Sequence, residues 1–142
     1  MNYLDQLDNM FDAQYRLITI ETYDPERVEE LIGQLSRFSN KAYYLSKPEH
    51  GLVRIGASHI EIPRTKLPAE LLNHILDARH FGIYILSDFH AALAEQSIVN
   101  LMHEIINSDI NKVVVLLGQE IELPDSLLPF TMRSKHQVKN PA

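Results

Sequence analysis

The sequence of 142 residues contains no cysteine. A chain without cysteine forms no disulfide scaffold, binds no zinc through thiolates and has no thiol nucleophile. Small disulfide-rich secreted domains, thiolate zinc modules and cysteine hydrolases are therefore excluded. The same absence fits an intracellular protein.

Cations and long apolar runs are also scarce. Lys and Arg number 13 against 19 Asp and Glu, which gives a formal net charge of −6. Nucleic-acid affinity rests largely on Lys and Arg that displace counterions from phosphates, so we expect no DNA or RNA partner. The start, MNYLDQLDNMFDAQ, carries early acids and matches neither a secretory signal nor a membrane span. We therefore expect no membrane association and a cytoplasmic location.

The rest of the composition is typical of a folded domain. Hydrophobic residues make up 45% of the chain and charged residues 23%, which are ordinary globular values. This length fits one domain, residues 1–142, with one core.

Several segments carry apolar residues at the helical spacing of three and four. The segment 25–38 is one of them, and Asp24 followed by Pro25 supplies its start, with Asp24 as the cap and Pro25 at the first helical position. Helices are expected over residues 3–13, 25–38, 68–78 and 91–108, with a short one around 125–128.

Strand-like runs lie between the helical segments. Residues 82–87 are apolar at consecutive positions, which is typical of a central strand covered on both faces of a parallel sheet. Further strands are expected over residues 16–22, 41–46 and 111–117, within 131–138, and as a small hairpin over 51–63. The alternation predicts an α/β fold of three layers, a mostly parallel sheet flanked by helices.

The run FGIYILSDFH, residues 81–90, stops abruptly at Asp88. In nucleotide hydrolases a buried strand of this kind ends in the acid that organises Mg²⁺ beside the phosphates. Ligands of open parallel sheets bind beyond the carboxyl ends of the strands. The segments to inspect are therefore 22–27, 88–90 and 118–120.

The loop after the first strand is unsuited to phosphate. A phosphate-cradling loop needs glycines for close backbone approach and a Lys that reaches the phosphates. The segment ETYDPER, residues 21–27, has neither, and its three carboxylates would each repel a phosphate charge by about 4 kcal/mol at a protein surface. Tight triphosphate binding is not expected, and Asp24 and Arg27 are the candidates of this loop for contact with a nucleotide.

Asp88 and His90 lie two positions apart after a strand, so both can reach one side and are candidates for a shared metal or cofactor. A catalytic zinc site normally requires three protein ligands, and the other histidines are scattered without metal-binding spacing. We therefore predict no metal and no cofactor, and we interpret Asp88 as the cap of the helix that begins near Ala91.

Other chemistries have weaker support. Ser87 lies outside a G-x-S-x-G turn, and the aromatic residues beside the expected strands lack the interleaved Lys and Arg of a base-stacking surface. We interpret these aromatic residues as core and assign no catalytic residue.

Four segments resemble the amino-terminal domain of large AAA-type ATPases encoded in chloroplast genomes and in cyanobacteria. They extend from about Tyr15 to about Leu128 and read YRLITIETYDPERVEELI, LLNHILDA, FGIYILSDFH and KVVVLLGQEIELPDSLL. The resemblance implies a degenerate P-loop-type sheet without a phosphate loop, which in these ATPases precedes the module that hydrolyses ATP. The phosphate loop, Mg²⁺-binding acid and arginine finger of that module have no counterparts in this sequence. Because the sequence ends in KHQVKNPA soon after the last expected strand, we expect a stand-alone version of the domain.

We therefore expect a non-catalytic domain that acts through protein contacts or in regulation, with a second copy of itself or an AAA ATPase as its partner. The rival hypothesis is a weak nucleotide-binding or ATP-hydrolysing protein that uses Asp88 with a non-standard loop at residues 23–27. A metal hydrolase at Asp88 and His90 is a third alternative.

Overall fold

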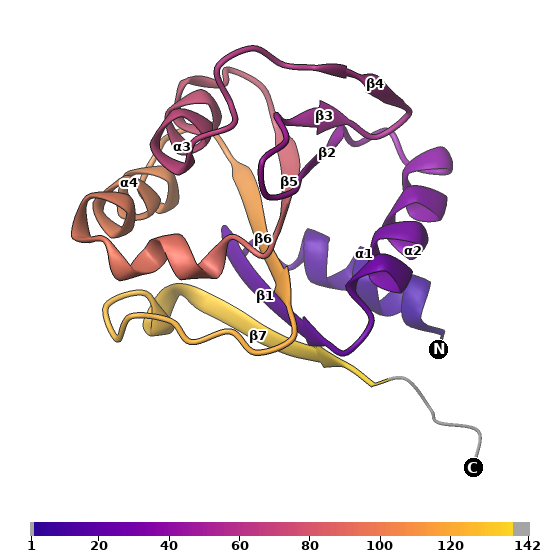
Figure 1. The fold of residues 1–142 in the computed structure, drawn as a ribbon. Coiled ribbons are helices and arrows are strands. Elements are labelled where there is room, and N and C mark those ends of the chain that lie inside the picture. The colour runs from indigo at the N-terminus through magenta and orange to yellow at the C-terminus, as the bar shows by residue number, and fades with distance from the viewer. Residues whose placement is uncertain (1, 138–142) are drawn as a thin grey trace.

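The computed structural model describes residues 2–137 and contains one seven-stranded sheet (Figure 1). Its strands are β1 (Leu17–Thr22), β2 (Tyr43–Ser46), β3 (Val53–Arg54), β4 (Ala57–Glu61), β5 (Gly82–Ser87), β6 (Lys112–Gly118) and β7 (Thr131–His136). The order across the sheet is β4-β3-β2-β5-β6-β1-β7, and only the hairpin of β3 and β4 is antiparallel to its neighbours. The predicted mostly parallel sheet is confirmed, and β5 is its middle strand.

Both faces of the central strands are buried. Every residue of β5 and β6 is buried, and successive side chains of a strand point to opposite faces of the sheet. Ile83 and Ile85 therefore join one hydrophobic core, and Tyr84 and Leu86 join the other. This division explains why the sequence is apolar at consecutive positions rather than at alternate ones.

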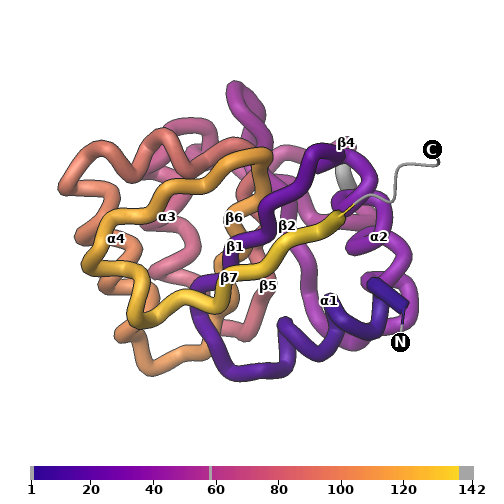
Figure 2. The backbone as a smooth tube through the Cα atoms, turned by 90° about the horizontal axis from the view of Figure 1, so that it is seen from below, coloured from indigo at the N-terminus to yellow at the C-terminus, as the bar shows by residue number. Residues whose placement is uncertain are grey.

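Two helices cover each face. The first pair is α1 (Tyr3–Asp12) and α2 (Pro25–Arg37), and the second is α3 (Pro68–Asp77) and α4 (Gln96–Ile106). Their apolar stripes pack on opposite sides of the sheet, which gives the three predicted layers (Figures 1 and 2). Full burial of one Leu or Ile side chain stabilises the fold by about 1.5–3 kcal/mol. Within residues 2–137, no helix combines the length and the apolar character needed to cross a bilayer.

The expected helix over residues 91–108 is wrong as one continuous element. A 3-10 helix, η1 (His90–Ala94), comes first, and Glu95 is extended before α4 begins. The reason lies in the apolar stripe, because Leu93 and Ile98 are five positions apart and both are buried in the same core. A continuous α-helix does not put residues with that spacing on one face, so the chain breaks between them.

The ends of two further elements also differ from the ranges expected from the sequence. The helix expected around residues 125–128 is a turn followed by the 3-10 helix η2 (Leu128–Phe130). Pro129 explains the shift, since proline is tolerated in the first turn of a helix and not further inside it. The last strand lies within the expected range as β7, and Val138 falls outside the described residues.

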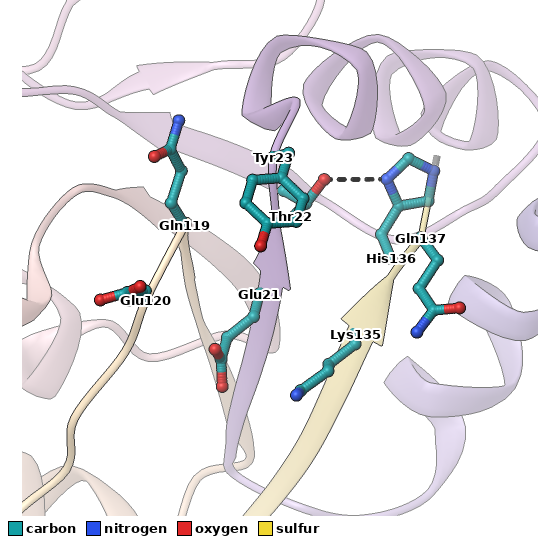
Figure 3. Close-up of a pocket in the computed structure, with 8 residues that line it drawn as sticks. All are labelled: Glu21, Thr22, Tyr23, Gln119, Glu120, Lys135, His136 and Gln137. Atoms are coloured by element: carbon teal, nitrogen blue, oxygen red, sulfur yellow. Dashed lines mark hydrogen bonds between the residues drawn. The ribbon is translucent and has the colours of Figure 1, made fainter. Parts of the chain in front are cut away.

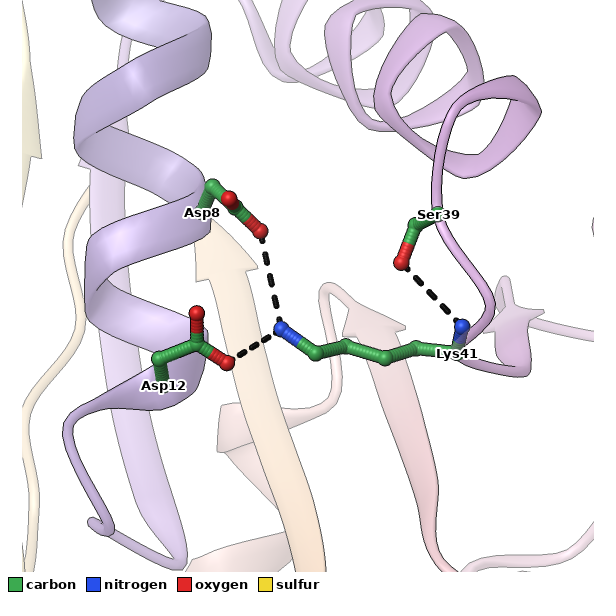
Figure 4. Close-up of polar contacts among 4 residues, drawn as sticks. All are labelled: Asp8, Asp12, Ser39 and Lys41. Carbon is green, nitrogen blue, oxygen red and sulfur yellow. Dashed lines mark hydrogen bonds and ion pairs between the residues drawn. The ribbon is translucent and has the colours of Figure 1, made fainter.

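Charged groups orient α1 against the rest of the domain. The Lys41 ammonium lies 3.5 Å from an Asp8 carboxylate oxygen and also pairs with Asp12, and its backbone amide donates to Ser39 (Figure 4). Such exposed pairs contribute at most about 1 kcal/mol each. The burial of Leu7 and Phe11 therefore holds α1 in place, and the ion pairs refine its position.

Two cations satisfy helix carbonyls at the amino end of the sheet. Lys112 Nζ donates to the Leu76 carbonyl at 2.6 Å, near the end of α3. Arg16 Nη1 donates to the Ile106 carbonyl at 3.0 Å, at the end of α4. The last carbonyls of a helix have no partner within the helix and carry partial negative charge. Burial lowers the pKa of Lys112, so this contact is made by a poorly solvated ammonium.

Candidate functional site

Three strands end around one hollow at the carboxyl edge of the sheet (Figure 3). Its volume is about 500 Å³. We call it the β1–β7 hollow; its lining residues are Glu21, Thr22, Tyr23, Gln119, Glu120, Lys135, His136 and Gln137.

The chain topology opens this hollow. After β1 the chain enters α2, which packs on one face of the sheet. After β6 it crosses the other face, where Leu127 is buried in the core beneath α3 and α4. Neighbouring parallel strands whose connections leave on opposite faces create a crevice at their carboxyl ends, which is the usual ligand position in open α/β sheets.

The charges of the β1–β7 hollow favour a cation over an anion. Glu21 lies opposite Lys135 in the register of β1 and β7, and both side chains extend to the same side of the sheet (Figure 3). Glu120 is exposed and adds a second carboxylate. Carboxylates thus outnumber the single ammonium among the lining residues, and a phosphate chain would meet net repulsion.

Asp24 and Arg27 lie at the start of α2, outside the lining of the hollow. The Asp24 carboxylate accepts a hydrogen bond from the Arg27 amide at 3.1 Å, and Pro25 occupies the first turn, so the predicted cap is confirmed. The Arg27 guanidinium lies 3.2 Å from a Glu30 carboxylate oxygen. The helix end that could receive an external anion is thus occupied by the side chain of Asp24.

A histidine connects the last strand to the loop after the first. His136 Nδ1 lies 2.9 Å from the Thr22 hydroxyl oxygen, which accepts the Asp24 amide at 3.0 Å (Figure 3). The Tyr3 ring stacks on His136 at a tilt, with 4.5 Å between centroids. Burial lowers the pKa of His136, Arg27 lowers it further and Asp24 opposes them. The imidazole is therefore neutral at neutral pH.

Asp88 turns the chain after β5 and caps no helix. Its φ is 54°, in the left-handed region that Asp tolerates better than most residues. Its amide donates to the Leu117 carbonyl at 2.9 Å, which extends the pairing of β5 with β6. Neither η1 nor α4 has a side-chain cap. The interpretation of Asp88 as the cap of a helix near Ala91 is therefore wrong, because the turn is complete before the first helical residue.

His90 borders a second hollow, of about 440 Å³. We call it the η1 hollow; its lining residues are His90, Ala91, Leu93, Ala94, Glu120, Glu122, Leu123 and Pro124. The buried Nδ1 of His90 has no hydrogen-bond partner among the described residues. A Cβ added to Gly118 would lie 2.8 Å from His90 Cε1 and 3.5 Å from an Asp88 carboxylate oxygen. The structure therefore brings Asp88 and His90 together over Gly118, away from Asp24 and Arg27.

The arrangement provides no metal centre in the described part of the chain. Across residues 2–137, no three His, Asp or Glu side chains converge closely enough to hold a metal ion. Asp88 and His90 therefore supply at most two ligands, fewer than a catalytic zinc site normally uses.

Sequence reasoning missed Lys135 and His136. It located the strand that contains them but assigned that strand no neighbour. In the structure β7 pairs with β1 over its full length, which brings Lys135 opposite Glu21 and His136 opposite Thr22. The pairing joins residues more than a hundred positions apart, so no local pattern carries it.

Replacement of Gly118 by Ala should displace the His90 ring. The new Cβ would overlap the ring, which has to turn aside. Because the ring is the end of a partly buried side chain, the cost should lie at or below the lower end of the range of about 1–3 kcal/mol typical of core overpacking. Urea unfolding measures the loss, and the NMR signals of the His90 ring report the displacement. Gly33→Ala is the control, because a Cβ there meets nothing within 4 Å and a helical Gly→Ala change should stabilise by about 0.5–1 kcal/mol. An unperturbed His90 signal in Gly118→Ala would contradict the described contact.

Acidification should destabilise the domain through His136. Because its folded pKa is below the usual 6.5, the unfolded chain binds more protons once the pH falls under 6.5. This contribution leaves stability unchanged above 6.5 and lowers it as the pH falls towards the folded pKa. Urea unfolding at several pH values should show a smaller acid-induced loss in His136→Asn than in the native chain. His59→Asn, at an exposed position, is the control; equal pH dependence in all three proteins would refute the assignment.

Comparison with known proteins identifies the family. Residues 3–135 match the family described as "SpoVK-like AAA ATPase, N-terminal domain". Among curated proteins, the search gives no match. The match covers nearly every described residue, including all strands of the sheet except the last position of β7. The chain therefore belongs to the family of SpoVK-like AAA ATPase N-terminal domains.

Proposed function

We propose that this domain is a non-catalytic protein-interaction or regulatory unit, built on a degenerate P-loop-type sheet, that acts together with an AAA ATPase module or with a second copy of itself. The observation that carries the proposal is the occupied start of α2. Asp24 accepts the Arg27 amide there, and Pro25 has no amide to offer. A nucleotide phosphate would have to displace a carboxylate from the position where phosphates bind in nucleotide-binding sheets.

The surroundings of that helix start support the same function. Glu21 and Glu120 line the adjacent β1–β7 hollow, so the nearest cavity also disfavours polyphosphate. Neutral His136 supplies no compensating charge. The sheet thus has the architecture of a ligand-binding fold, whereas the start of α2 and the β1–β7 hollow beside it lack the electrostatics that phosphate chemistry requires.

The family description supports the choice of partner. It names an N-terminal domain of an AAA ATPase, a domain that accompanies a catalytic module. Contact with that module is the role that we infer from this description. The lack of cysteine fits a reducing compartment, and we place the activity in the cytoplasm.

Calorimetric titration with ATP and Mg²⁺ tests the non-catalytic part of the proposal. No saturable heat is expected from the native chain or from Asp88→Ala, because the acids at the strand ends repel the phosphates. A coupled assay should likewise detect no ATP hydrolysis above the buffer rate. A saturating isotherm that Asp88→Ala weakens would favour a nucleotide-binding protein instead.

Sedimentation velocity tests the interaction part. The purified domain, alone over a range of concentrations and mixed with an AAA module of a family member, should form either a self-associated species or a complex. A circular dichroism spectrum typical of a folded α/β domain, recorded on the same sample, excludes unfolded material. A domain that remains monomeric at every concentration and does not sediment with the module would contradict the proposal.

A further inference from the structure

The η1 hollow has an apolar floor. Leu93 is only 4% exposed and belongs to the core beneath α3 and α4, and the partly buried Leu123 packs against the same core. Ala91 and Ala94 are exposed on η1, and their small side chains leave the hollow open. The floor therefore offers aliphatic surface without a side chain that fills it.

The rim of the same hollow is acidic. Glu120 and Glu122 line it and are both exposed, and no Lys or Arg is among its lining residues. Glu120 also lines the β1–β7 hollow, so the two hollows share this carboxylate. Tyr23, which is 86% exposed, also lines the β1–β7 hollow and offers an aromatic face there.

We propose that the η1 hollow receives the side chain of a Lys or Arg from a basic segment of a protein partner. The aliphatic stem lies on Leu93 and Leu123, and the cation lies between Glu120 and Glu122. This inference rests on the proposed interaction function and names the chemistry of the partner.

The match between hollow and ligand follows from the amphipathic nature of these side chains. Lys and Arg bury their methylene groups on apolar surface and keep the charged head near solvent. An apolar side chain would leave the rim carboxylates without a partner, and an acidic one would be repelled by them. The β1–β7 hollow, which Glu120 also lines, contains the exposed ring of Tyr23, where a second cation of the same segment could find cation–π attraction.

The test uses the full chain and a defined probe, the acetylated and amidated peptide Gly-Arg-Gly-Arg-Gly. Calorimetry at low ionic strength should detect binding, which should weaken as salt is added. The double variant Glu120→Gln and Glu122→Gln should bind about threefold to tenfold more weakly, as expected for loss of exposed ion pairs. Ala94→Leu, which fills the hollow without changing the charge, should also weaken binding.

The control variant, Glu95→Gln with Glu104→Gln, removes the same charge from exposed positions at the start and on the surface of α4. It should bind the peptide as the native chain does. Equal affinity of both double variants, or no binding to the native chain, would overturn the proposal. A spermidine titration distinguishes the source of the cation, since spermidine binding as tight as that of the peptide would indicate a free polyamine and overturn the assignment of a protein partner.

These outcomes are independent of the ATP titration. Failure of the peptide to bind leaves the non-catalytic assignment intact, whereas saturable binding of ATP would contradict that assignment even if the peptide binds.

Discussion

Burial of both faces of β5 and β6 is the constraint on which the rest of the structure depends. Each strand contributes alternate side chains to two separate cores, so the sheet is stable only when helices cover both sides. The chain meets this requirement by sending α1 and α2 to one face and α3 and α4 to the other. The crevice at the carboxyl edge lies where the connections after β1 and β6 leave on opposite faces.

The two edges of the sheet have different electrostatic roles. At the amino edge, Lys112 and Arg16 are engaged with carbonyls at the ends of α3 and α4. At the carboxyl edge, Glu21, Glu120 and Glu122 line open hollows. Cations in an acidic chain are thus used partly for internal contacts, and carboxylates outnumber the single ammonium of Lys135 in these two hollows.

Local patterns predicted most of this architecture. The consecutive apolar residues of β5 and β6 indicated buried parallel strands because two-sided burial leaves no polar alternation. The pair Asp24 and Pro25 indicated the start of α2 because capping depends on neighbours only three positions apart. The break after η1 could also have been found, since Leu93 and Ile98 do not fit one helical stripe.

The site was harder to predict, because it depends on contacts between distant segments. The sequence analysis interpreted Asp88 as a helix cap because it follows a strand. In the structure, its left-handed backbone and its position over Gly118 follow from the pairing of β5 with β6. Lys135 and His136 join the hollow only because β7 lies beside β1. The family match confirms the resemblance to an AAA ATPase N-terminal domain and extends it into β7.

The contact between Asp24 and the Arg27 amide also affects which anions can bind at the start of α2. A carboxylate tethered three residues from the amide that donates to it acts as an intramolecular competitor of external anions, with an effective local concentration of about millimolar or more. A free anion therefore reaches this helix start only at a concentration, or with an affinity, that outcompetes the tethered carboxylate.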